Sequence, residues 1–117
     1  MVNVQTPLQS FRQESFPAIT QASTDVMTAL YSTNITSCNS VKITFTVSTN
    51  AVLLGVTMSP QTDETTAIYQ PSATAYQITF PTYSEYTDMA LRLQSAVGGA
   101  HGTVALTSVV KRGARYF

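Results

Sequence analysis

The chain has 117 residues, with six Lys and Arg against six Asp and Glu, so its formal net charge at pH 7 is zero. Charged residues make up 10% of it and hydrophobic residues 44%, whereas about 25% of a typical soluble domain is charged. The hydrophobic share excludes a disordered chain, and the balanced charge gives no basis for nucleic-acid binding. We expect one packed domain whose copies tend to associate, because little charge repulsion separates them.

Cysteine content and hydropathy bound the chain further. Cys38 is the only cysteine, so no internal disulfide can form, and we expect a buried or idle thiol. No run of 18 apolar residues is present, and the first residues lack the basic start and apolar centre of a signal peptide. We therefore expect no membrane partner and synthesis in a cytoplasm.

The N-terminal stretch, residues 1–17, lacks a sustained hydrophobic period. Phe11 and Phe16 lie between Pro7 and Pro17, which favours an extended arm. Aromatic side chains are rarely left in water. We expect the arm to lie along its own domain or along a neighbouring subunit, with a flexible tail as the alternative.

Residues 19–30 fit two periods. Ile19, Ala22 and Val26 fall at helical spacing, whereas Val26, Thr28 and Leu30 fall at strand spacing. The residues that follow are poor helix formers, so we favour a strand over 26–32 followed by a loop to about residue 40, with a short helix as the alternative.

The clearest period runs from Val41 to Met58. Apolar residues alternate with polar ones over 41–48, which predicts a strand with one buried face. Residues 52–58 alternate with a less polar second face, which indicates a central strand or one covered on both sides. Ser48, Thr49 and Asn50 supply the turn between the two strands.

Four more strands are expected after this pair, and prolines or a glycine-rich turn at 98–102 separate them. Adjacent Val109 and Val110 indicate a bulge in the last strand or burial of both its faces. The strands are expected at 66–69, 76–80, 89–94 and 103–110. About seven strands and no long helix predict an antiparallel, jelly-roll-like β-sandwich at 18–110, between an arm at 1–17 and a tail at 111–117.

The residues that carry chemistry in enzymes are scattered. His101 is the single histidine and lies between glycines without a predicted partner. Asp63 and Glu64 are neighbours, so in an extended chain they point to opposite sides, and nothing brings Glu85 or Asp88 to them. We expect no enzyme, no metal site and no cofactor.

Two groups of residues are candidates for binding. Tyrosines combine a flat apolar face with a polar tip and can stack on sugar rings, so glycan contacts are possible at Tyr69, Tyr83 and Tyr86. Arg and aromatic residues are enriched at interface hot spots. On that basis we predict contacts with a neighbouring chain, with a solvated tail as the alternative, at Phe11, Phe16, Arg112, Arg115, Tyr116 and Phe117.

Two resemblances complete the picture. Residues 83–111, with MALRLQ, GGAHG and TVALTSVVKRG in order, resemble the closing strands of galactose-binding-like carbohydrate-binding modules. The whole chain, small, rich in Thr and poor in charge, resembles the decoration or cement proteins of tailed-phage capsids. The second resemblance implies a structural virion protein, made in the host cytoplasm, which binds capsid subunits and forms homo-oligomers. The first implies a module that recognises host glycans.

Overall fold

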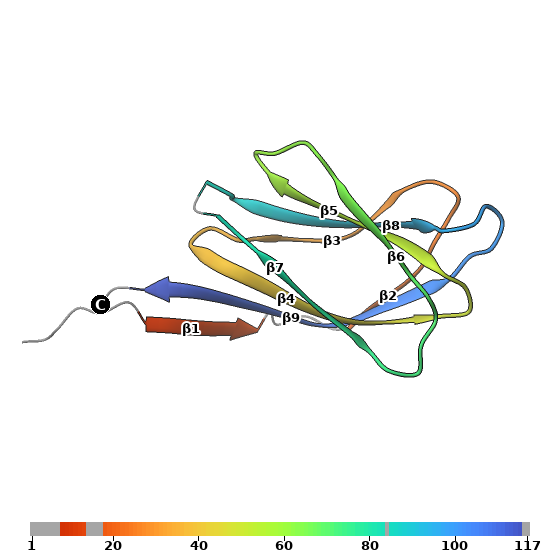
Figure 1. Cartoon of the computed structure of the whole chain (residues 1–117), viewed down its shortest axis with the longest axis horizontal. Coiled ribbons are helices and arrows are strands. Elements are labelled where there is room, and N and C mark those ends of the chain that lie inside the picture. Colours follow the sequence, from red (N-terminus) through yellow and green to blue (C-terminus); the bar gives the residue numbers. More distant parts are fainter. Residues whose placement is uncertain (1–7, 14–17, 84, 116–117) are drawn as a thin grey trace, which may run out of the picture.

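The structure, a computed structural model, describes residues 8–13, 18–83 and 85–115, and this part of the chain is all β (Figure 1). No helix that could span a membrane occurs in it. The nine strands are β1 (Leu8–Gln13), β2 (Ile19–Ala22), β3 (Thr28–Asn34), β4 (Cys38–Ser48), β5 (Val52–Ser59), β6 (Thr65–Tyr69), β7 (Tyr76–Pro81), β8 (Asp88–Ser95) and β9 (Thr103–Arg115). The predicted antiparallel β-sandwich is confirmed, with two strands more than expected.

The strands pair as one long hairpin rolled over itself. β5 pairs with β6, β4 with β7, β3 with β8 and β2 with β9, all antiparallel. Rolling brings β4 beside β9 and β5 beside β8. The result is two sheets, β2-β9-β4-β7 and β3-β8-β5-β6, which is the eight-stranded jelly roll. β1 extends the first sheet by pairing with the far half of β9.

The core lies between the two sheets, and the predicted alternation of β4 is confirmed. Its four apolar residues face inward and are nearly or fully inaccessible to solvent: Val41, Ile43, Phe45 and Val47. β5 lies between β8 and β6 and is therefore a central strand of its sheet, as predicted from its less polar second face. Val52 and Leu54 of β5 meet Leu91 and Leu93 of β8 in the same core.

β9 contains a bulge that changes which of its residues face the core. Thr44 of β4 pairs with Ser108, but Phe45 pairs with Leu106, so Thr107 is the extra residue. Before the bulge the even-numbered residues, such as Leu106, are buried, and after it the odd-numbered Val109 is buried. The predicted bulge therefore exists, two residues earlier than Val109, and it inverts the faces of everything that follows.

Three local expectations differ from the structure. A strand was expected over 26–32, but β3 lies two residues later, and residues 19–22 form a further strand, β2, because they pair with residues 103–106 of β9. β4 begins at Cys38, so the loop after β3 is only three residues long. β9 continues to Arg115 instead of ending at Val110, because β1 and β4 both supply hydrogen-bonding partners along it.

Candidate functional site

Three of the six predicted interface residues, from the two ends of the chain, lie on a single ribbon. β1 runs antiparallel to the end of β9 (Figure 1). In this register Phe11 is paired with Arg112 and Leu8 with Arg115. No pattern in the sequence indicated that these two segments, about a hundred residues apart, are adjacent. Three other predicted interface residues lie outside the described residues: Phe16, Tyr116 and Phe117.

Arg112 lines a small hollow on the outer face of the first sheet. The hollow has a volume of about 220 Å³, and Lys42, Ser40 and Thr79 line it together with Arg112. Both Lys42 and Arg112 are exposed. Two cations in one small hollow suit a carboxylate more than an apolar ligand.

Lys111 was assigned to the tail at 111–117, but its side chain is not exposed as that of Arg112 is. Its side chain is buried between the sheets, with 7% of the residue exposed. The ammonium donates hydrogen bonds to Thr33 Oγ1 at 3.1 Å and to the carbonyl oxygen of Asn34 at 2.8 Å. The bulge at Thr107 causes this, because it turns the odd-numbered residues of β9 inward. The Lys111 side chain therefore links β9 to β3 by hydrogen bonds and is not a surface charge.

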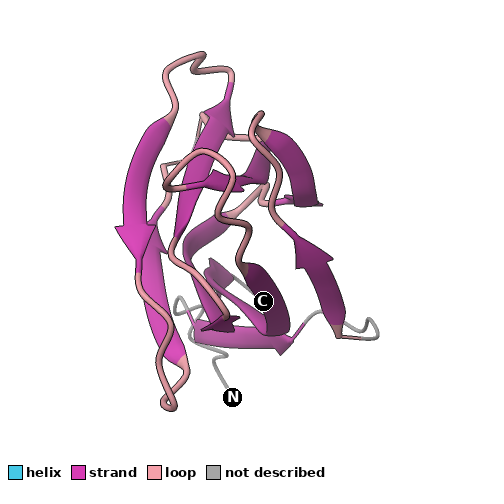
Figure 2. Cartoon of the chain, turned by 90° about the vertical axis from the view of Figure 1, so that its right-hand side faces the viewer, coloured by secondary structure: helices cyan, strands magenta, loops and turns pink. Residues whose placement is uncertain are grey.

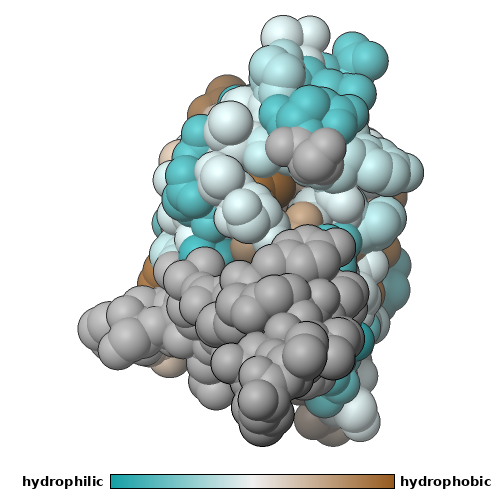
Figure 3. Space-filling view, turned by 90° about the vertical axis from the view of Figure 1, so that its left-hand side faces the viewer, coloured by the Kyte–Doolittle hydropathy of each residue, from teal (hydrophilic) through white to brown (hydrophobic). Residues whose placement is uncertain are grey.

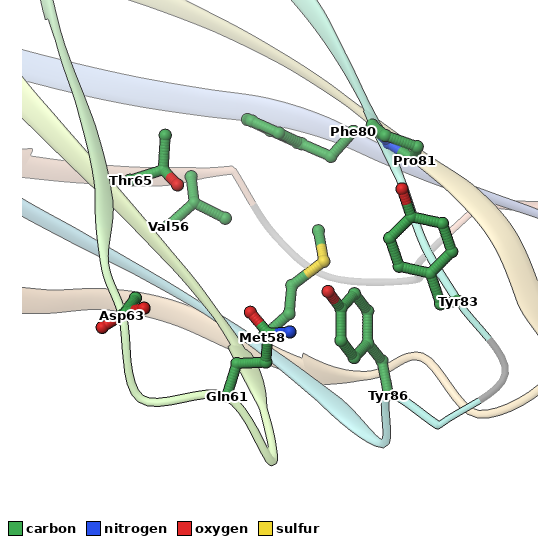
Figure 4. A pocket seen from close by; sticks show the side chains of 9 residues that line it. All are labelled: Val56, Met58, Gln61, Asp63, Thr65, Phe80, Pro81, Tyr83 and Tyr86. Carbon is green, nitrogen blue, oxygen red and sulfur yellow. The ribbon is translucent and has the colours of Figure 1, made fainter.

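Two of the three candidate glycan tyrosines line one pocket. It lies at the end of the sandwich where β5 and β7 finish and has a volume of about 300 Å³. Figure 3 views this end and shows apolar surface recessed between more hydrophilic residues. The described residues that line the pocket are Val56, Met58, Gln61, Asp63, Thr65, Phe80, Pro81, Tyr83 and Tyr86 (Figure 4).

The pocket has an aromatic side and a polar side. Tyr83 and Tyr86 pack edge to face, with ring centroids 5.3 Å apart and 65° between the planes. A turn fixes the pair, because the backbone N–H of Tyr86 donates to the carbonyl of Tyr83 at 3.0 Å. Asp63 lies across the pocket from both rings, with Met58 between them (Figure 4). Tyr86 is buried, whereas 57% of Tyr83 is exposed.

Asp63 and Glu64 point to opposite sides of the chain, as their adjacency predicted. Asp63 lines the pocket, whereas Glu64 reaches over Gly55 on the outer face of the second sheet. There Glu64 pairs with Arg92 at 3.4 Å. Among the described residues that line the pocket, Asp63 is the single carboxylate, so a second carboxylate for glycosidase chemistry is not brought to it.

Tyr69 lies elsewhere, in an aromatic cluster with Phe45 and Tyr76. Its ring packs edge to face at 5.1 Å from Phe45 and 5.0 Å from Tyr76. Burial, and then the neighbouring Tyr76 phenol, raise the pKa of Tyr69 above its ordinary value of 10.0. The ring of Tyr69 packs against the hydrophobic core and does not line the pocket of Tyr83 and Tyr86.

This raised pKa predicts the alkaline behaviour of the fold. The phenol of Tyr69 ionises at a lower pH in the unfolded chain than in the folded one, so stability present below pH 10 falls as the pH rises through the folded pKa. Tyr69→Phe should make the urea midpoint fall less steeply above about pH 10. Tyr83→Phe, which removes an exposed phenol, is the control. Identical slopes for wild type and Tyr69→Phe would contradict the assignment.

His101 has partners that the sequence did not predict. It is exposed in the turn before β9, as expected, at the end of the sandwich seen in Figure 2. Its Nδ1 lies 2.9 Å from Ser95 Oγ and 3.9 Å from Asp25 Oδ1. A serine–histidine–carboxylate relay needs the two partners on different ring nitrogens. Here Ser95 and Asp25 both contact Nδ1 of His101, and Ser95 Oγ also forms a hydrogen bond with Ser23 Oγ at 2.9 Å. The group therefore fastens the β2–β3 and β8–β9 loops together.

Fold and sites together define the chain as a small jelly-roll β-sandwich with an edge ribbon and an aromatic pocket. Jelly rolls are widely used by viral shell proteins and by lectins. Comparison with protein-family models, curated proteins and solved structures finds no match. The described residues contain no group of three or more His, Cys, Asp or Glu placed to hold a metal ion.

Proposed function

We propose that this protein is a structural subunit that assembles with other protein chains through the edges of its sheets. The observation that carries the proposal is the chemistry of those edges. Soluble monomers usually protect edge strands with charged residues or proline, because an open edge is a template for pairing with another chain. β3 (TALYSTN) and β6 (TTAIY) contain neither, and β7 (YQITFP) contains only the proline at its end.

β6 is the most open of these edges. Its first four residues are exposed, and 58% of Ile68 is accessible to solvent. Within the described part of the chain β6 pairs on one side only, with β5. A strand from another chain can add to its free side, which is a common mode of protein association. Ile68 then gains a cross-strand neighbour on the outer face of the extended sheet.

The composition and the terminal ribbon support a virion role. A net charge of zero and 10% charged residues leave little repulsion between crowded copies. The ribbon of β1 and β9 places Phe11 opposite Arg112, and the hollow with Lys42 and Arg112 suits an acidic segment of a neighbouring subunit. We propose a capsid decoration or other minor structural protein of a virus particle, with a homo-oligomer as its assembled form.

The edge proposal is tested by placing a charge on β6. Ile68→Lys should abolish self-association at concentrations where the wild type assembles, because a lysine on an edge strand disfavours the addition of a further strand. Sedimentation velocity over a concentration series measures the change, and circular dichroism checks the fold.

Val26→Lys is the matched control, because Val26 is a similarly exposed hydrophobic residue, at 65%, but lies in the β2–β3 loop rather than on an edge strand. It should associate as the wild type does. A wild type that stays monomeric at high concentration, or an Ile68→Lys variant that assembles normally, would refute association through β6.

A further inference from the structure

The pocket lined by Tyr83 and Tyr86, here called the tyrosine pocket, has the size of a small-ligand site. Its volume of about 300 Å³ is at the lower end of the range for ligand pockets, about 300–1,000 Å³. This is room for one ring-sized group. Strands β5, β6 and β7, the loop at 60–64, and Tyr83 and Tyr86 form its walls, so the site exists in a single copy of the chain.

The aromatic side of the pocket offers a surface on which a ring can stack. Tyr83 and Tyr86 are held edge to face by their shared turn, and Phe80 and Pro81 continue the apolar surface. Tyr83 is more than half exposed. An exposed aromatic ring beside an apolar recess suits a ligand with one apolar face and polar edges.

The opposite side offers hydrogen-bonding groups of three kinds. Gln61 has an amide, Asp63 a carboxylate and Thr65 a hydroxyl, and all three line the pocket. Amides and hydroxyls both donate and accept hydrogen bonds, whereas an ionised carboxylate accepts them. This mixture matches the hydroxyl groups of a sugar, each of which also donates and accepts.

Charge narrows the class of ligand. Among the described lining residues Asp63 is the only charged one, so no cation is present there to hold a phosphate, sulfate or carboxylate. A ligand ammonium would be attracted by tyrosine faces and a carboxylate. However, Asp63 lies across the pocket from the rings (Figure 4), and Gln61 and Thr65 would find no partner on a quaternary ammonium.

From this geometry we propose that the pocket binds a neutral hexopyranose, such as the terminal sugar of a glycan. The ring stacks on Tyr83, and its hydroxyls donate to Asp63 and exchange hydrogen bonds with Gln61 and Thr65. A single ring held in this way binds weakly, with Kd on the order of 1 mM. If the chain assembles as proposed above, a particle carries many copies of this weak site, and avidity then strengthens its binding to a glycan.

The test is saturation-transfer NMR of the full chain with glucose, galactose, mannose and N-acetylglucosamine, and with choline as a separate arm. At least one sugar should receive saturation, and amide shifts should be confined to residues 56–65 and 80–87. Tyr83→Ala should abolish the transfer, and Asp63→Asn should weaken binding at least tenfold. Circular dichroism confirms that both variants fold.

Glu64→Gln is the matched control, because Glu64 is adjacent to Asp63 but points to the opposite side of the chain, where it pairs with Arg92. It should bind as the wild type does. No transfer to any of the four sugars at about 50 mM, transfer to choline alone, or full binding by Tyr83→Ala would each overturn the proposal.

Discussion

Gly102→Ala is expected to lower the free energy of unfolding by about 3 kcal/mol or more. Gly102 is buried where the β8–β9 turn meets the β4–β5 turn. A Cβ atom there would overlap the carbonyl oxygen of Asn50 and lie 2.9 Å from Val52 Cγ1. The obstacle includes backbone, which cannot move aside as a flexible side chain can.

The same substitution would disturb the fastening of two loops. The N–H of Gly102 donates to Ser23 Oγ at 2.9 Å, and its carbonyl accepts from the N–H of Ser23 at 2.7 Å. Any shift of residue 102 that relieves the overlap stretches these bonds. The loss therefore combines overpacking with weakened buried hydrogen bonds.

Gly98→Ala is the control for this prediction, since it lies in the same turn and a Cβ atom there meets nothing within 4 Å. Its φ is not in the left-handed region, so we expect a change within about 0.5 kcal/mol. Urea denaturation with a shared m-value measures both variants. Similar midpoints for the two variants would show that the turn adapts and would contradict the close approach at Gly102.

Lys111→Ala is expected to destabilise the fold by about 2–4 kcal/mol. The substitution removes the donor from Thr33 Oγ1 and from the carbonyl of Asn34, both on β3. It also removes the buried alkyl stem that fills the space between the sheets. The unpaired carbonyl and the cavity both oppose folding.

Lys42→Ala provides the comparison, because Lys42 is exposed on the outer face of β4. Removing it should change stability by no more than about 0.5 kcal/mol. Chemical denaturation of the two variants at pH 7 gives the difference directly. If Lys111→Ala unfolds at the wild-type midpoint, the ammonium is solvated and β9 does not depend on it.

Part of the candidate site was predictable from local pattern. Tyr83 and Tyr86 were singled out as sugar-stacking residues, and the structure places both in one pocket. Asp63 and Glu64 were expected on opposite sides of the chain, and the structure confirms this. Tyr69 was grouped with the other two tyrosines, but it packs with Phe45 and Tyr76, because cross-strand neighbours are set by register and not by residue type.

The sequence by itself determined the class of fold. The alternation over 41–48 and 52–58, the prolines and glycines between runs, and the lack of a long helical period are local properties, and local sterics and burial decide them. They were sufficient for the β-sandwich and for the buried face of β4. These local patterns did not predict β1 or β2, because the two short strands are held by pairing with β9 and have no hydrophobic period of their own.

Only the tertiary structure decided the position of Lys111. The sequence KRGARYF has the composition of a solvated basic end, and strict alternation through Leu106 and Ser108 would turn Arg112 inward and Lys111 outward. The extra residue at Thr107 reverses that order. A bulge is fixed by the pairing of β9 with β4, that is, by residues about sixty positions away, and a one-residue shift moves every later side chain to the other face.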